Sequence, residues 1–175
     1  MKKLIALILV VAMAASLVAC GNKAAAEKAP LEGTMEENAM KVMEIAPVEF
    51  MGGIIPVDLT DTSEDGKWAV NYFTGLSDSS KITDVAVYES MMGSQAFSLV
   101  MVRTAEGADP KAVAEEMKSG IDPRKWICVG ADEIMAAGYG DTVMFIMLDS
   151  QLGLSAQSYV DAFAQVAGGE LDFTI

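Results

Sequence analysis

The first twenty residues of the chain, MKKLIALILVVAMAASLVAC, constrain the fold most, because they set apart an export segment from the residues that can fold. Lys2 and Lys3 give a basic start, and an almost unbroken apolar run from Leu4 to Val18 follows. A run of about 15 residues suits the apolar region of a secretory signal, whereas a helix that spans a bilayer needs roughly 20. We therefore expect the folded part to begin after this segment.

The apolar run ends in Leu17-Val18-Ala19-Cys20, which resembles the lipobox of bacterial lipoproteins. In that motif the chain is cut before the cysteine, whose thiol carries a diacylglycerol. A plain secretory signal has small residues at both key positions before its cut, so the larger pair here favours lipidation. Two acyl chains hold a protein stably, because each buried CH₂ contributes about 0.8 kcal/mol. The sequence predicts a signal peptide at 1–19, lipidation of Cys20, and a place on the extracytoplasmic face of the cell membrane.

Charge narrows the classes of partner. The full chain has 12 basic and 25 acidic residues, and removal of 1–19 takes away two lysines and no acid, which leaves a net charge of −15. Binding to phosphates draws on clustered Lys and Arg, so we expect no nucleic acid partner and no second, electrostatic contact with anionic lipid. The acidic excess favours solubility through self-repulsion, with attraction of cations or basic partners as the alternative.

The chain contains no histidine, which excludes Ser-His-Asp and Cys-His catalysis on this chain and zinc sites built with imidazole. After lipidation, Cys128 is the one cysteine left, so no disulfide can form within one chain. Its apolar neighbours, in Trp126-Ile127-Cys128-Val129, predict a buried thiol rather than a nucleophile. Stability must come from an ordinary hydrophobic core.

Composition predicts a flexible tether at 20–33 and a single domain at 34–175. Helices are expected at 34–46, 110–119 and 155–167, the first with a capping box that begins at Thr34 and the last capped by Ser155. Alternating apolar residues predict two hairpins, 83–91 with 95–104 and 132–138 with 142–149, and a short strand at 171–175. Residues 48–80 have no clear period, and 67–73 fits a helix or a strand.

The order hairpin, helix, hairpin, helix predicts an α+β fold. We expect an antiparallel sheet built from the two hairpins, with the helices packed on one face as a two-layer sandwich. Three stretches within 85–148, namely Val85–Met92, Ala112–Glu116 and Ala136–Phe145, resemble a family of uncharacterised bacterial lipoproteins that is classed as a domain of unknown function. The resemblance implies a compact α+β lipoprotein domain outside the cytoplasm, and it implies no catalytic or binding residue.

One stretch resembles the first half of a calcium loop. Asp61, Ser63 and Asp65 place oxygen ligands at alternate positions before Gly66, but Tyr72 occupies the twelfth position, where a bidentate Glu is expected. A weak calcium site and a solvated acidic turn are the two interpretations. No other cofactor is expected.

Two further sets of residues are candidates for a site. Carboxylates border the predicted strands and could work as an acid and base pair: Glu89, Asp132, Glu133, Asp141 and Asp149. Methionines fill apolar patterns at Met101, Met117, Met144 and Met147, but Met91 and Met92 are adjacent at a turn and cannot both point inward, so one of them is expected to be a partner contact.

These observations favour a tethered, non-enzymatic binding or interaction module that meets an envelope protein or ligand. The alternatives are a carboxylate-based envelope hydrolase and a weak calcium-binding domain.

Overall fold

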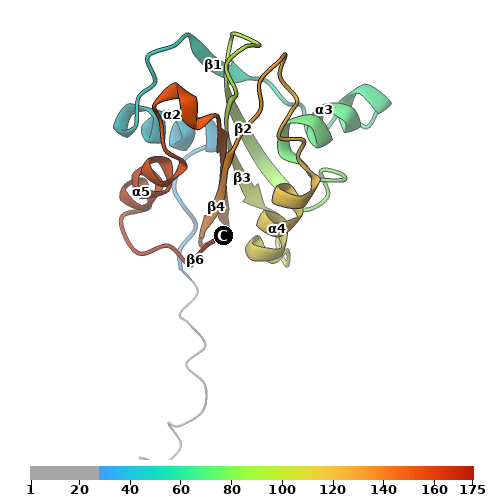
Figure 1. Cartoon of the computed structure of the whole chain (residues 1–175). Coiled ribbons are helices and arrows are strands. Elements are labelled where there is room, and N and C mark those ends of the chain that lie inside the picture. The colour runs from blue at the N-terminus through green and yellow to red at the C-terminus, as the bar shows by residue number, and fades with distance from the viewer. Residues whose placement is uncertain (1–27) are drawn as a thin grey trace, which may run out of the picture.

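The computed structural model describes residues 28–175, which form an α+β fold of four α-helices on a six-stranded antiparallel sheet (Figure 1). The predicted signal peptide and Cys20 lie outside the described residues. The strands are β1 (Gly52–Ile55), β2 (Ile82–Ser90), β3 (Phe97–Thr104), β4 (Glu133–Tyr139), β5 (Thr142–Leu148) and β6 (Phe173–Thr174). The helices are α2 (Met35–Ile45), α3 (Glu64–Thr74), α4 (Pro110–Gly120), the short 3₁₀ helix η1 (Ser150–Leu152) and α5 (Ala156–Ala167).

The strands lie in the order β1-β2-β3-β5-β4-β6, and every neighbouring pair is antiparallel. Both predicted hairpins are confirmed, as β2–β3 and β4–β5, and they join through β3 and β5 at the centre of the sheet. The predicted C-terminal strand is confirmed as β6, which pairs with β4. The sheet also gains β1, from the part of the chain that had no clear period.

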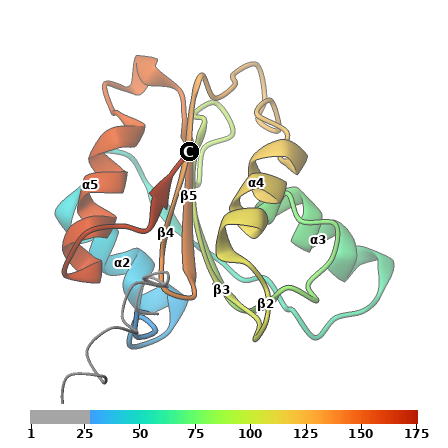
Figure 2. The ribbon, with the colours of Figure 1, turned by 90° about the horizontal axis from the view of Figure 1, so that it is seen from below.

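The helices cover both faces of the sheet, so the expected two-layer sandwich with helices on one face is wrong (Figure 2). Helices α2 and α5 pack on one face, and α3 and α4 pack on the other. The reason lies in β5, where all seven residues are buried. Val143, Phe145 and Met147 join the core beneath α3 and α4, whereas the intervening Met144 and Ile146 join the core beneath α2 and α5. A strand that is apolar on both faces needs cover on both.

Carboxylates from the sheet cap the two helices on one face. The predicted capping box of Thr34 and Glu37 is confirmed at the start of α2, and the Asp84 carboxylate of β2 also accepts a 2.8 Å hydrogen bond from the Met35 N–H. At α5, Ser155 takes the N-cap position, but its side chain makes no cap hydrogen bond. Glu133 of β4 accepts from the Ala156 N–H at 2.7 Å instead. A helix N-terminus favours such a negative partner.

The sheet has two ends that matter for a site. At one end, hereafter the Met91 end, β2 turns into β3 through Met91 and Met92. At the other end, hereafter the Lys28 end, Arg103 of β3 donates hydrogen bonds to the carbonyl oxygens of Leu31 and Gly33. The described residues 28–33 thus already contact the domain. In Figure 1, β1 lies near the top and β6 near the bottom.

Candidate functional site

Four large apolar side chains are exposed at the Met91 end, and we call this set the methionine patch: Met51, Met91, Met92 and Ile127. Two backbone hydrogen bonds hold the three contributing segments together. The Met91 N–H donates to the Met51 carbonyl oxygen at 2.9 Å, and the Ile127 N–H donates to the Gly93 carbonyl oxygen at 2.9 Å. The patch therefore combines the start of β1, the β2–β3 turn and the loop before β4.

These side chains are among the most exposed large apolar residues of the described chain, together with Trp68 of α3, which is 59% exposed. Met51 is 74% and Ile127 73% exposed, and Met91 and Met92 are 61% and 51% exposed. Both methionines of the adjacent pair are thus exposed, where one was expected. In contrast, Met101, Met117, Met144 and Met147 are fully buried, as predicted. An exposed apolar patch is a common mark of a contact surface.

A buried ion pair positions the loop that carries Ile127. The Nζ atom of Lys125 lies 2.5 Å from a carboxylate oxygen of Glu89 on β2, and the Lys125 side chain is 1% exposed. Burial lowers the pKa of Lys125, although the negative charge of Glu89 opposes that shift. Since a buried charge is costly without a partner, this pair fixes where residues 122–131 can lie.

Aromatic rings complete the surroundings of the Lys125 ammonium group. Its Nζ atom lies 4.9, 5.2 and 5.3 Å from the ring centroids of Tyr72, Phe73 and Trp126. The Tyr72 hydroxyl donates to the Lys125 carbonyl oxygen at 3.2 Å, and burial, followed by the charge of Glu89, raises the pKa of Tyr72. These contacts tie the loop to α3 as well as to β2.

Cys128 is exposed, so the prediction of a buried thiol is wrong. Its backbone adopts a φ of +64°, the one positive φ among the described non-glycine residues. Non-glycine residues rarely adopt this left-handed conformation, and the neighbouring Ile127 is exposed as well. A depression of about 400 Å³ adjoins the thiol and is lined by Arg124, Trp126, Cys128, Val129 and Gly130.

Each of the candidate carboxylates has a structural partner in the described part of the chain. Glu89 is paired with Lys125, and Glu133 caps α5. Asp132 accepts from the backbone and hydroxyl of Ser150, and these hydrogen bonds lower the pKa of Asp132. Asp149 caps η1, and Asp141 lies at the Lys28 end, 3.5 Å from the Arg103 guanidinium. Each group has a separate structural partner.

The calcium-like segment forms the N-terminus of α3. The Asp61 carboxylate accepts from the Ser63 N–H at 2.9 Å, and the Ser63 hydroxyl oxygen accepts from the Gly66 N–H at 3.2 Å. Hydrogen bonds with Ser63 lower the pKa of Asp61. Asp65 lies exposed in the first turn of the helix. Over residues 28–175, no group of three or more Cys, Asp or Glu side chains is placed to hold a metal ion. Calcium binding by this segment stays a prediction.

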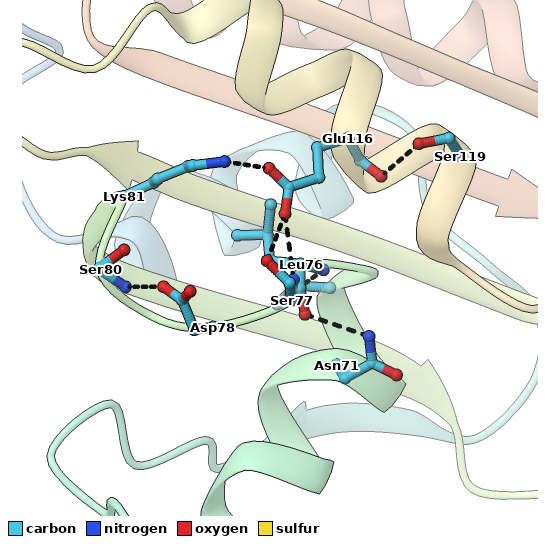
Figure 3. Close-up of polar contacts among 9 residues, drawn as sticks. Asn71, Leu76, Ser77, Asp78, Ser80, Lys81, Glu116 and Ser119 are labelled. Atoms are coloured by element: carbon cyan, nitrogen blue, oxygen red, sulfur yellow. Dashed lines mark hydrogen bonds and ion pairs between the residues drawn. The ribbon is translucent and has the colours of Figure 1, made fainter.

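A second polar cluster joins the α3–β2 loop to α4 (Figure 3). Glu116 accepts from the backbone and hydroxyl of Ser77 and forms an ion pair with Lys81. The hydrogen bond from Lys81, together with those from Ser77, lowers the pKa of Glu116. The hydrogen bond to Glu116 and the charge of that carboxylate raise the pKa of Lys81. The ion pair therefore holds the α3–β2 loop against α4.

The chain matches no family model, no curated protein and no solved structure. The resemblance to the lipoprotein family therefore stays a prediction. None of the helices described in residues 28–175 is long and apolar enough to cross a membrane.

Sequence reasoning missed three residues of this site. Met51 lies in residues 48–80, which have no clear period, Ile127 lies between two predicted elements, and Lys125 stands 36 positions from its partner Glu89. A signal was present in Lys125-Trp126, because a lysine beside an aromatic residue in an apolar segment often covers a ring or pairs with a buried acid.

Proposed function

We propose that this protein is a lipid-anchored binding module, which is held on the extracytoplasmic face of the membrane and docks an envelope protein through the methionine patch. One observation carries the proposal: the patch lies at the opposite end of the sheet from Lys28, the first described residue. Lys28 pairs with Asp172 at 2.8 Å, next to β6, whereas Met51 and Met91 meet at the far side, where β1 begins and β2 ends.

The length of the predicted tether supports this orientation. Lys28 stands eight positions after Cys20, so a fully extended chain between them reaches about 28 Å at most. The nine residues of β2 extend over about 30 Å. An anchor at Cys20 would keep the Lys28 end near the membrane and present the methionine patch to partners further out.

The small size of the methionine patch and the acidic charge of the chain indicate what kind of partner would fit. Four side chains are too few for a whole interface, because stable interfaces bury about 800 Å² on each partner, so the patch would form the apolar centre. Exposed Glu49 and Asp132 lie at the same end of the sheet, and the mature chain carries a net charge of −15. We therefore expect a protein with an apolar contact surface and a basic rim, because potentials across an interface are complementary.

Photo-crosslinking in intact cells, with the lipid anchor preserved, tests the proposal. A photoreactive residue is placed at Met92, at Ile127, or at Met40 of α2, which is 41% exposed and belongs to a different surface. We expect Met92 and Ile127 to give the same adduct and Met40 not to give it. If all three positions give the same adducts, or none gives any, the patch is not a docking surface.

Cell fractionation tests the anchor separately. The variant Cys20→Ala is expected to leave the membrane fraction for the soluble fraction, because the acyl chains supply the attachment. If the variant stays in the membrane fraction, the lipobox interpretation is wrong, whatever the crosslinks show. The matched control is Cys128→Ala, which removes the other thiol and leaves the anchor in place.

A further inference from the structure

Exposed sulfur atoms gather at the Met91 end. The described chain has 11 methionines, of which four are exposed: Met40, Met51, Met91 and Met92. Three of these four belong to the methionine patch, and the exposed thiol of Cys128 follows Ile127 directly. The chain thus brings three thioethers and its one described thiol to the same end of the sheet.

The backbone places these side chains next to one another. Since Gly52 pairs with Ser90, Met51 lies opposite Met91 in the same antiparallel register, and the Met91 N–H donates to the Met51 carbonyl oxygen at 2.9 Å. Side chains directly opposite each other on antiparallel strands lie on the same face, with Cβ atoms about 5 Å apart. Met92 is the next residue, in the turn. A methionine side chain has three rotatable bonds and adapts its sulfur position readily.

The loop of Cys128 is held against the same turn. The Ile127 N–H donates to the Gly93 carbonyl oxygen at 2.9 Å. Gly93 follows Met92 and Ile127 precedes Cys128, so this hydrogen bond joins the two segments. The buried Lys125–Glu89 pair holds the other side of the loop on β2. The four sulfur-bearing residues therefore belong to three segments that backbone hydrogen bonds join, and the flexible methionine side chains can adjust the positions of their sulfur atoms.

We propose that Met51, Met91, Met92 and Cys128 form a binding site for a soft monovalent metal ion, Cu(I) or Ag(I). Thioether and thiolate sulfurs select such ions, and a chain without histidine has no imidazole that would favour other transition metals. The metal replaces the proton of the Cys128 thiol, and that proton is released to solvent. The thioethers coordinate without loss of a proton. No change of oxidation state is involved.

This inference goes beyond the proposed docking function and is independent of it, because the two depend on different properties of the same surface. Docking needs apolar area, which leucine supplies as well as methionine. Metal binding needs sulfur, which leucine lacks. The variant M51L/M91L/M92L should therefore keep docking and lose metal binding. The variant Ile127→Asp should lose docking, because it harms an apolar contact, and should keep metal binding, because it keeps every sulfur.

Competition with a chromophoric Cu(I) chelator under reducing conditions tests the site. The full mature lipoprotein in detergent, in which the lipid occupies the Cys20 sulfur, is compared with a Cys20→Ser form, so that Cys20 cannot account for binding. We expect one Cu(I) per chain, at least tenfold weaker binding in M51L/M91L/M92L, weaker binding in Cys128→Ser, and no change in the control Met40→Leu. Titration with Ag(I) is expected to give the same order.

Circular dichroism checks that the triple variant is folded. Retention of full Cu(I) affinity by the folded triple variant, or an equal loss in Met40→Leu, would overturn the site. Because Ile127→Asp is expected to keep Cu(I) affinity while it loses the crosslinked partner, failure of the metal site and failure of the docking function give different results.

Discussion

Lys125 of the loop before β4 and Glu89 of β2 form an ion pair with a 2.5 Å separation, and the lysine side chain is 1% exposed. The pair lies beneath the loop that carries both Ile127 and Cys128. We predict that Glu89→Gln lowers the free energy of unfolding by about 3–5 kcal/mol, because it leaves a buried ammonium group without a counter-charge. Urea denaturation at neutral pH measures the change.

The double variant E89Q/K125M is expected to recover a large part of this loss, since it removes the uncompensated charge. A matched control is Glu64→Gln, because the Glu64–Lys67 pair is exposed and its loss should change stability by no more than about 0.5 kcal/mol. If E89Q and E64Q cost the same, the Lys125–Glu89 pair does not stabilise the loop.

The backbones of Gly75, which ends α3, and Gly120 of α4 lie close together. A β-carbon on Gly120 would overlap the carbonyl oxygen of Gly75, and neither backbone can move without disturbing a helix end. We predict that Gly120→Ala destabilises the fold by about 3 kcal/mol through overpacking. Thermal unfolding compares it with Gly169→Ala, where a β-carbon would meet nothing within 4 Å and which should change stability little. Equal melting temperatures for the two variants would contradict the close approach.

The four α-helices and the sheet could be predicted from the sequence to different degrees. Helices α2, α4 and α5 carry local signals, namely a cap, a first-turn proline and a terminal glycine, and their predicted bounds hold within one residue or so. The cover of both faces was not predicted, because an alternating apolar pattern indicates one buried face, whereas every residue of β5 is buried. The alternate residues of that strand are equally apolar, and this signal was available.

The site was harder to predict, because its contacts join segments far apart in the chain. Glu89 and Lys125 are 36 positions apart, and the local pattern Lys125-Trp126 indicates a partly buried lysine without indicating which acid is its partner. The exposure of Cys128 follows its positive φ, which apolar neighbours do not reveal. The adjacency of Met91 and Met92 did predict an exposed methionine, since two successive residues of a strand point to opposite faces.

Glu116 links stability to pH. Its pKa is lowered below the ordinary value of 4.5, first by the hydrogen bond from Lys81 and then by those from Ser77. A lowered pKa contributes stability that is complete above about pH 4.5 and is lost as the pH falls through the folded-state pKa. We predict that Glu116→Gln is less stable than the wild type at pH 7 and that the difference shrinks from pH 4.5 downward.

Urea denaturation from pH 7 to pH 3 measures this difference. Asp65→Asn is a matched control, because this carboxylate is exposed and makes no hydrogen bond or ion pair in the described part of the chain. A gap between Glu116→Gln and the wild type that stays constant with pH would mean that the charge of Glu116 does not contribute.

Tyr159 of α5 is fully buried in the core beneath α2 and α5, and its hydroxyl has no hydrogen-bond partner among the described residues. Because a buried hydroxyl without a partner costs free energy, we predict that Tyr159→Phe leaves stability unchanged or raises it by up to about 1 kcal/mol at pH 7. Tyr72→Phe, which loses the hydrogen bond to the Lys125 carbonyl, should instead cost about 1 kcal/mol. A destabilised Tyr159→Phe at pH 7 would show that the hydroxyl has a partner.

The same tyrosine predicts a loss of stability at high pH. Burial raises the pKa of Tyr159 from 10.0 to about 12, so the hydroxyl is neutral at ordinary pH. Above pH 10 the unfolded chain ionises at this position before the folded protein does, and the wild type therefore loses stability as the pH rises toward 12. The variant Tyr159→Phe has no proton to lose there and is expected to keep that stability. Urea denaturation of both proteins at pH 7 and pH 11 measures the difference, and an advantage of the variant that is no larger at pH 11 than at pH 7 would contradict the raised pKa.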